Sequence, residues 1–477
     1  MNPSQPDTAA RPDPGGNKAG TAAPGGKDRP GMLSAAVTGA CALALVLLFL
    51  WHYLTRGIVF AWYEYVWAAL YLTLFIVVGA RFVPVWLKAW SDKSVSLSRR
   101  EKAGFREYGL VALAVLAAHA AVWLFAFIHA RLTGDTFSGP FSYLYASDSP
   151  HYLDIAENWY VNDGPRGQVV RLVFLPLYPL IVRAASFLTG DTYSAAIGVS
   201  VACSCGAGCM LYRTALDSMG RKAARRAVKY FCLFPGFFFY GCALSESLFL
   251  LLGLCCVFFS ARRRWLPAAV FAGLAAFTRS PGVLFAAPLL FELIGAAAQA
   301  DRAERRRLTR TGVLCALITF SGFAAYLYVN YRVSGSWFRF LDYQKENWFQ
   351  SPGWFFDTPR YQLDYFVRYI RDKSVPNAFG LWGANLLSLL SALLLMAFTA
   401  RTQRPSHTAY FLVYFVFTTG VTWLLSGPRY MLACFPLVLA LALLSRRRAA
   451  DAALTALCII FSALLFLAYL SNGVPVY

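Results

Sequence analysis

Long apolar runs follow one another through most of the chain, and this pattern limits the possible folds more than any other feature. Runs of roughly 15–25 apolar residues are the length that a helix needs to cross a bilayer. Hydrophobic residues make up 58% of the 477 positions and charged residues only 14%, which excludes an ordinary soluble domain. We therefore predict an all-α, polytopic membrane protein with about 13 transmembrane helices. The predicted spans lie near residues 33–54, 62–84, 108–132, 192–215, 228–243, 245–261, 265–279, 282–297, 312–331, 377–399, 408–425, 428–445 and 452–470.

The formal net charge of +20 comes from basic residues that gather in short stretches between the apolar runs. This placement is typical of the cytoplasmic loops of membrane proteins and not of a nucleic-acid-binding surface, so we expect no nucleic-acid partner. With a cytoplasmic N-terminus and alternating spans, each strong basic cluster falls on the inside. The predicted cytoplasmic loops are 85–107, 216–227, 262–264, 298–311, 400–407 and 446–451.

The same topology places two long loops, 133–191 and 332–376, outside the cytoplasm. Both mix aromatic and charged residues, which predicts helices lying in the outer membrane interface. Within the first loop, the apolar piece 172–182 is expected to lie on the surface or to re-enter, because another full crossing would invert the orientation. We predict a bacterial plasma-membrane protein whose functional site is extracytoplasmic.

The chain divides into four predicted parts. Residues 1–31 are rich in Pro and Gly and predict a disordered cytoplasmic tail. Residues 32–107 hold two N-terminal spans and a basic loop, 108–450 form the core, and 451–477 hold the last helix and a tail. Most of the 11 cysteines lie inside apolar runs without metal-ligand spacing, so we interpret them as packing residues.

The polar stretch 145–154 sits between apolar segments and holds two acids and a histidine. An acid at the edge of a bilayer is a candidate for proton transfer, and we predict that Asp148 is a catalytic base. Asp154 and Glu157 are expected on the solvated face of an interfacial helix. His151 either positions a substrate or is a structural hydrogen-bonding residue.

Three further ionisable residues fall near the same predicted membrane face: Glu246, Arg279 and Arg429. Each alone could cap a helix or extend its charge to the interface, but their gathering at one face favours a functional site. Arginine suits a phosphate group, so Arg279 and Arg429 are candidate phosphate ligands. Arg171 and Arg183, which flank the re-entrant piece, are weaker candidates.

Glycosyl transfer from a lipid phosphate accounts for such a set of residues. The donor already carries its leaving group, so an inverting displacement needs one base for the acceptor hydroxyl and not a pair of carboxylates. The sequence has no DxD pair and no His/Cys cluster, and we expect neither a metal nor a cofactor. The alternative is a transporter or flippase of lipid-linked sugars, which would show inverted repeats and discontinuous helices.

Five motifs in order resemble the GPI mannosyltransferase II (PIG-V-type) family. The first loop carries DSPHYLDIA from Asp148 to Ala156, followed by FLPLYP from Phe174 to Pro179. The other stretches are ALSESLF at 243–249, FTRSPG at 277–282, GSWFRF at 335–340 with Gln344 and Trp348, and PRY at 428–430 with Pro436. The sequence differs from the family at Ala146–Ser147, where an Arg-Trp pair is usual, at Trp159–Tyr160, and in having two additional N-terminal spans.

This resemblance implies a glycosyltransferase of the GT-C superfamily, which uses polyprenyl-phosphate sugars on the outer face of a membrane. It implies mannose or a related hexose as the transferred sugar and a glycan or glycolipid as the acceptor. It also assigns the base to Asp148. Taken together, the ionisable residues above and these motifs give the predicted substrate-binding residues His151, Arg171, Glu246, Arg279, Gln344, Arg429 and Tyr430.

Overall fold

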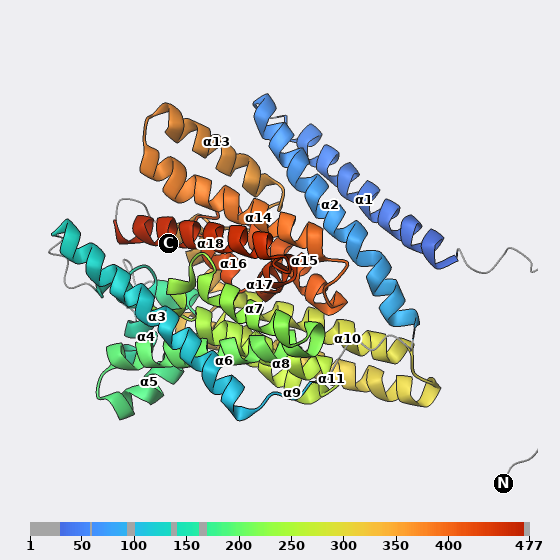
Figure 1. The fold of residues 1–477 in the computed structure, drawn as a ribbon, viewed down its shortest axis with the longest axis horizontal. Helices are drawn as coiled ribbons and strands as arrows, with labels where there is room; N and C mark the ends of the chain where they lie inside the picture. Colours follow the sequence, from blue (N-terminus) through green and yellow to red (C-terminus); the bar gives the residue numbers. More distant parts are fainter. Residues whose placement is uncertain (1–28, 58–59, 93–100, 135–140, 162–168, 472–477) are drawn as a thin grey trace, which may run out of the picture.

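The computed structural model describes residues 29–57, 60–92, 101–134, 141–161 and 169–471 (Figure 1). The predicted disordered tail, 1–31, lies almost wholly outside the described residues. The described part is helical, and its only strand-like pairing is one antiparallel bridge between Pro352 and Val421. The all-α prediction is confirmed.

Eight helical segments of the described chain are long and apolar enough to cross a membrane, which makes the chain an integral membrane protein. In chain order they are α1 (Arg29–Thr55), α2 (Trp62–Ser91), α3 (Phe105–Thr133), α6 (Thr192–Met219), the 3-10 helix η5 (Ser280–Phe285) with α10 (Ala286–Ala298), α11 (Arg302–Ser334), the π-helix η6 (Pro376–Gly383) with α14 (Ala384–Thr399), and α18 (Arg448–Leu470).

The remaining predicted spans are shorter or broken. Four shorter apolar helices are α5 (Leu177–Thr189), α8 (Glu246–Ala261), α9 (Trp265–Thr278) and α17 (Phe435–Leu444). The other helices that the structure has within the predicted spans are α7 (Arg221–Leu233), the 3-10 helix η4 (Phe237–Gly241), α15 (Pro405–Thr419) and α16 (Gly427–Leu432). The predicted span 228–243 is thus α7 and η4, and the span 428–445 is α16 and α17.

These breaks have local causes. α7 ends at Leu233, two residues before Pro235, and α17 begins with Pro436 in its first turn, so neither run continues as one helix. Every residue from 236 to 250 is buried in the protein. Non-helical backbone is tolerated at membrane depth only when protein surrounds it.

Short helices fill the two long loops, as predicted. The first loop holds the 3-10 helices η1 (Ser142–Tyr145) and η3 (Val170–Val173), together with α4 (Ser149–Asn158) and α5. The second holds α12 (Arg339–Trp348) and α13 (Asp357–Arg371). The apolar piece 172–182 contains the end of η3 and the start of α5, whose 13 residues are too few for a full crossing.

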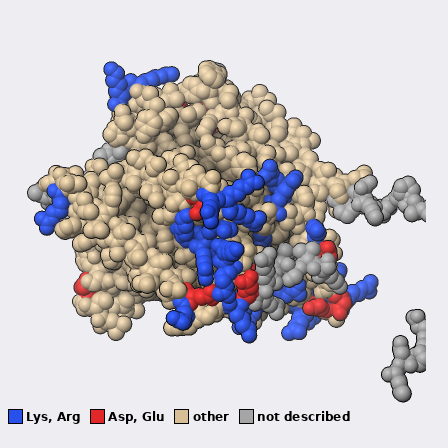
Figure 2. Space-filling view, viewed as in Figure 1, with Lys and Arg blue, Asp and Glu red and all other residues tan. Residues whose placement is uncertain are grey.

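Basic side chains gather in one broad band on the face drawn in Figure 2. Contacts tie three predicted cytoplasmic loops together. Arg262 pairs with Asp217 at 2.9 Å, Lys229 pairs with Asp451 at 2.9 Å, and Arg226 Nε donates to the Ala442 carbonyl at 2.9 Å. The basic clusters at 221–226, 262–264 and 446–448 therefore lie at one end of the helix bundle, as the topology prediction requires.

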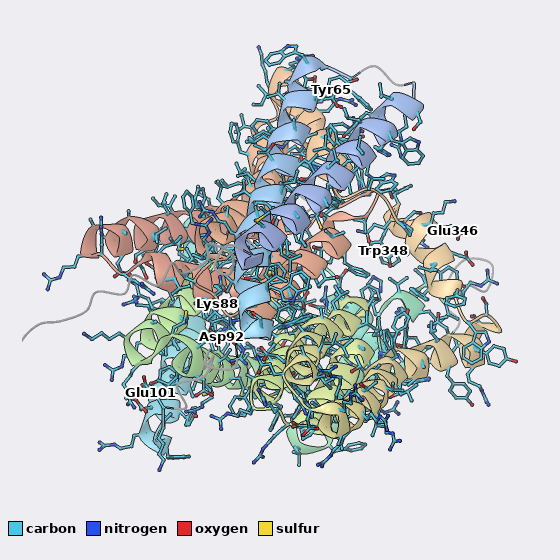
Figure 3. All side chains as sticks on the ribbon, turned by 90° about the vertical axis from the view of Figure 1, so that its right-hand side faces the viewer. Tyr65, Lys88, Asp92, Glu101, Glu346 and Trp348 are labelled. Atoms are coloured by element: carbon cyan, nitrogen blue, oxygen red, sulfur yellow. The ribbon has the colours of Figure 1, made fainter. Side chains whose placement is uncertain are left out.

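The two N-terminal helices, α1 and α2, pack side by side at the edge of the bundle (Figure 1). Figure 3 shows Tyr65 and Lys88 towards opposite ends of α2, with Trp348 and Glu346 on α12 well away from the Lys88 end. The division into an N-terminal pair and a core of 108–450 remains a prediction.

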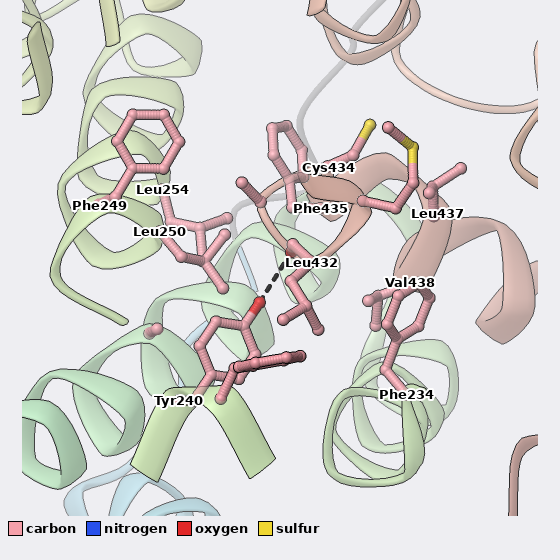
Figure 4. Packing of buried hydrophobic residues seen from close by; sticks show 14 of the residues in the cluster. Phe234, Tyr240, Phe249, Leu250, Leu254, Leu432, Cys434, Phe435, Leu437 and Val438 are labelled. Carbon is pink, nitrogen blue, oxygen red and sulfur yellow. Dashed lines mark hydrogen bonds between the residues drawn. The ribbon is translucent and has the colours of Figure 1, made fainter. Parts of the chain in front are cut away.

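The core next to the broken helices is packed from several distant segments (Figure 4). Tyr240 in η4 is buried, and its hydroxyl donates to the carbonyl of Leu432 in α16 at 2.7 Å. This bond fixes η4, just before α8, against α16. η4 leads to Glu246 at the start of α8, and α16 carries Arg429, so the bond lies next to two predicted site residues.

Candidate active site

Four charged side chains from four distant segments form one ion network. Arg429 Nη1 donates to Asp148 Oδ2 at 2.6 Å, and Arg429 Nε donates to Glu246 Oε1 at 2.5 Å. Arg279 Nη1 donates to the same Glu246 oxygen at 2.5 Å. The structure therefore brings together the four residues that the sequence placed at one membrane face.

Asp148 lies in the turn between η1 and α4. Ser147, just before it, has φ of 60°, a left-handed conformation that is unusual for a residue with a side chain. Pro150 then starts α4, and its fixed φ suits the first helical turn. The turn places the Asp148 carboxylate at the N-terminal end of α4, where the helix dipole favours a negative charge.

The other three residues lie at helix ends or in the short helix α16. Glu246 is the first residue of α8 and follows the buried segment that contains η4. Arg279 lies between α9 and η5, which begins at Ser280 and has Pro281 and Gly282 in its first turn. Arg429 is in α16, which begins with Pro428 at its first turn. The ends of α8 and α9 and the short helix α16 thus each place one charged group in the network.

Burial differs along the network. The exposed fraction of the side chain is 3% for Glu246 and 5% for Arg429, and it is 18% for Arg279 and 23% for Asp148. Two acids balance two bases, which is the condition for holding buried charges in an apolar core. Asp148 is the most accessible member, so it is the member best placed to meet a substrate.

Several polar atoms of this network have no hydrogen-bond partner among the described residues. Glu246 Oε2 and Arg429 Nη2 are buried and unpartnered. Asp148 uses Oδ2 for Arg429, and within the described chain no hydrogen bond engages its Oδ1. The network therefore retains both donor and acceptor capacity, which buried groups seldom leave unused.

Ser245 and Tyr152 extend the network, although the sequence did not single them out. Ser245 Oγ accepts from Arg279 Nη1 at 3.1 Å and bonds the Tyr152 hydroxyl at 2.8 Å. Burial raises the pKa of Tyr152 to about 12, which keeps its phenol protonated at neutral pH. Both residues lie inside quoted motifs, DSPHYLDIA and ALSESLF, and that position was the available signal.

His151 and Tyr430 lie beside the network. His151 is three residues after Asp148 on α4, and its ring stacks on Phe174 with the centroids 4.8 Å apart. The ring of Trp348, at the end of α12, is 6.3 Å from His151. These contacts join the two long loops next to Asp148. On the other side, the Tyr430 ring centroid lies 6.0 Å from the Arg279 guanidinium carbon.

The structure gives the two other predicted binding residues different partners. Arg171 Nη1 pairs with Asp154 Oδ2 at 2.9 Å, and the Asp154 side chain is 25% exposed. Asp154 is therefore ion-paired, where a solvated position was expected. Gln344 Nε2 donates to Gln350 Oε1 at 2.5 Å, and Gln350 in turn donates to the Trp423 carbonyl at 2.8 Å.

The polar side chains of the site carry carboxylates, guanidinium groups and hydroxyls. In the part of the chain that the structure describes, no group of three or more His, Cys, Asp or Glu side chains could hold a metal ion. The site can accept a proton at Asp148 and can hold an anion between Arg279 and Arg429, because both groups are charged at any physiological pH.

Comparisons with known proteins found similarity to three solved structures. No protein-family model and no curated protein matches the chain, so the resemblance to GPI mannosyltransferase II remains a prediction. ArnT from Cupriavidus metallidurans bound to undecaprenyl phosphate is 16% identical, with a TM-score of 0.45 over 76% of this chain and 64% of that one. Its apo form is 17% identical, with a TM-score of 0.44 over 73% of this chain and 62% of that one. The arabinosyltransferase EmbB from Mycobacterium smegmatis is 14% identical, with a TM-score of 0.42 over 84% of this chain and 41% of that one. The chain spans less than two thirds of the length of each of these proteins.

Proposed function

We propose that the protein is a membrane glycosyltransferase of the GT-C type. It moves mannose or a related hexose from a polyprenyl-phosphate carrier to an extracytoplasmic glycan or glycolipid. The observation that carries this proposal is the network in which the partly exposed Asp148 is bonded to Arg429, and Arg429 shares Glu246 with Arg279. One accessible carboxylate beside two arginines is the set that this reaction needs.

The proposed step is an inverting displacement at the anomeric carbon of the sugar. The acceptor hydroxyl oxygen attacks that carbon and forms the new glycosidic bond, while the bond from the carbon to the phosphate oxygen breaks. Asp148 takes the hydroxyl proton through Oδ1, and the bonding electrons leave with the phosphate. General-base catalysis of this kind contributes typically about 10²–10⁴-fold in rate.

The arginines act on the leaving phosphate, whose negative charge grows as the bond breaks. Arg429 has a buried Nη2 without a partner among the described residues, and Arg279 is the more exposed of the two arginines. A guanidinium group that strengthens its bond to phosphate as charge develops stabilises the transition state more than the bound donor. Glu246 holds the two arginines next to each other and neutralises part of their charge before a donor binds.

The pairing of Asp148 with Arg429 has a consequence for the base. Arg429 holds the Asp148 carboxylate through Oδ2 at 2.6 Å. When the donor phosphate competes for Arg429, this bond loosens and both carboxylate oxygens become available to the acceptor hydroxyl. Donor binding and activation of the base are then coupled through a single guanidinium group.

A second candidate function is transport of a lipid-linked sugar. The structure has the discontinuous helices that such a protein would use, at α7–η4 and at α16–α17. The buried breaks carry charged residues towards one site, which either function can exploit. An assay for a new glycosidic bond separates the two, because a transporter leaves the donor intact.

The test is a transfer assay with purified full-length protein in liposomes, supplied with radiolabelled polyprenyl-phosphate mannose and a lipid extract as acceptor. We expect label to move from the carrier to a new product, with polyprenyl phosphate released. Asp154→Asn, on the same helix α4, tests the rival acid and should retain transfer. Movement of intact donor across the bilayer without product would support the transporter. Transfer from GDP-mannose without a lipid carrier would contradict the proposed donor class.

A further inference from the structure

One carboxylate in the second long loop is contacted by polar side chains at the C-terminal end of helix α1. Asp357, the first residue of α13, accepts from the Tyr53 hydroxyl at 3.2 Å and from Arg56 Nη1 at 3.2 Å. His52 Nε2 lies 2.8 Å from Asp357 Oδ2, the oxygen that Arg56 also contacts. The Asp357 side chain is 14% exposed. Two side chains of the last turn of α1, and Arg56 directly after it, therefore converge on one residue of α13.

Aromatic packing and a second ion pair strengthen this junction. Phe356 is fully buried, with its ring 5.3 Å from that of Phe49 and 5.1 Å from that of His52. Arg360, one turn along α13, pairs with Glu64 of α2 at 2.9 Å. Both N-terminal helices are thus joined to the start of α13.

The same turns of α13 are also hydrogen-bonded to the segment 419–424, which precedes Arg429 of the candidate active site. Thr358 Oγ1 donates to the Thr419 carbonyl at 2.6 Å, and Gln362 Nε2 donates to the Leu424 carbonyl at 3.0 Å. The Leu424 amide donates to the Tyr361 hydroxyl at 2.6 Å. The segment 419–424 is therefore bonded to α13 by the side chains of Thr358, Tyr361 and Gln362, which lie within the first turns after Asp357.

The segment before α13 adds backbone pairing to the same stretch. The Gly353 amide donates to the Gly420 carbonyl at 2.9 Å, and the Thr422 amide donates to the Ser351 carbonyl at 2.9 Å. A Cβ at Gly353 would lie 3.1 Å from the Val421 carbonyl carbon, so the two backbones are in close contact. Residues 351–362 and 419–424 behave as one packed unit.

From this unit the chain runs directly to Arg429. Asn385 Nδ2 donates to the Leu425 carbonyl at 2.9 Å, and its Oδ1 accepts from the Gly427 amide at 2.6 Å. Two residues later, Arg429 reaches Asp148 and Glu246. A continuous series of bonds therefore connects α1 to the guanidinium group at the centre of the network.

We propose that Asp357 is a positioning residue: it anchors α13 to the N-terminal helices and thereby fixes Arg429 for the reaction. This inference rests on the proposed function and gives a role to the two additional N-terminal spans. Asp357 does not contact the reacting groups. It acts through α13 and the segment 419–424, and a displacement of Arg429 by about 1 Å would cost on the order of a hundredfold in rate.

The test compares full-length Asp357→Asn with Asp364→Asn. Asp364 is also on α13, but its partner is the exposed Arg368 one turn away, so it is the matched control. Transfer by Asp357→Asn should fall by about tenfold or more, with a lower kcat and a higher donor KM. Asp364→Asn should behave as the unchanged protein.

A double-mutant cycle with Arg429→Lys tests the route. If Asp357 acts through Arg429, its substitution should lower transfer less than about threefold once Arg429 is already lysine. Additive losses would overturn the inference. If Asp357→Asn folds poorly, Tyr53→Phe replaces it in the cycle. This milder variant removes one hydrogen-bond donor to Asp357 and should show the same pattern with smaller losses.

Hydrogen exchange supplies a readout that needs no substrate. Backbone amides of residues 419–432 should exchange faster in Asp357→Asn than in the unsubstituted protein. In Asp364→Asn their exchange rates should be unchanged. Equal exchange in both variants would overturn the inference and leave the proposed function standing. Absence of transfer in the unsubstituted protein would instead contradict the proposed function, while the exchange experiment would still decide the positioning role.

Discussion

At the scale of single residues, the charge balance of the network depends on Glu246. One of its oxygens accepts from both Arg279 and Arg429, and the side chain is 3% exposed. Glu246→Ala leaves two guanidinium groups short of a counter-charge, and we expect a loss of about 3–5 kcal/mol in the free energy of unfolding. Glu346→Ala, an exposed glutamate on α12, should change stability little. Thermal unfolding in detergent measures both, and similar midpoints would contradict the buried network.

The two arginines should differ in their effect on catalysis. Arg429 contacts both acids and is almost fully buried, whereas Arg279 bonds Glu246 and Ser245 and lies over the Tyr430 ring. Arg429→Ala should lower kcat and raise the donor KM together, because it removes a phosphate ligand and the partner of the base. Arg279→Ala should also raise the donor KM but should lower kcat less than Arg429→Ala does. Steady-state kinetics over a range of donor concentrations separates these outcomes, and a normal KM in both variants would exclude the phosphate role.

The grouping of Asp148, Glu246, Arg279 and Arg429 could be predicted from sequence, because membrane topology alone assigns them to one face. Their individual bonds could not. Ser245 and Tyr152 join the site through side-chain geometry, and Arg171 pairs with Asp154 across a loop. Such pairings depend on the three-dimensional placement of segments, which spacing along one chain does not encode.

At the scale of helices, hydropathy indicates apolar runs but not where the backbone breaks. The run 228–243 is apolar throughout its second half, yet α7 ends at Leu233, and the buried stretch that follows forms the short 3-10 helix η4 instead of continuing as an α-helix. A segment surrounded by protein can be as apolar as a helix facing lipid. The breaks that position Glu246 and Arg429 were therefore predicted as continuous spans.

Close packing of α9 on α11 gives a prediction at this scale. A Cβ placed at Gly322 would lie 1.9 Å from the Gly273 carbonyl oxygen, so the two backbones are in direct contact. Gly322→Ala should force these helices apart and cost about 1–3 kcal/mol of stability. Gly198→Ala on α6 is the matched control, because a Cβ there meets no atom within 4 Å. Equal thermal midpoints for the two variants would contradict this helix contact.

For the whole molecule, orientation in the membrane is the main prediction. Single cysteines at Lys345 and Arg305, both exposed, report on the two faces. In intact cells an impermeant maleimide should label Lys345→Cys and leave Arg305→Cys unlabelled until the membrane is opened. The unsubstituted protein, with its native cysteines, supplies the background. Labelling at 305 with protection at 345 would invert the topology and place Asp148 inside.

The most direct test of the central claim is transfer by Asp148→Asn beside the unsubstituted protein in the same liposomes. Asparagine keeps the shape and an acceptor for Arg429, but it cannot take a proton, so folding and donor binding should be nearly unchanged. Asp342→Asn, whose side chain is 54% exposed, is the matched control and should keep full transfer. We expect Asp148→Asn to lose at least about a hundredfold in rate. If Asp148→Asn keeps more than about a tenth of the activity, this is far more than remains after the loss of a general base, and Asp148 is not the catalytic base.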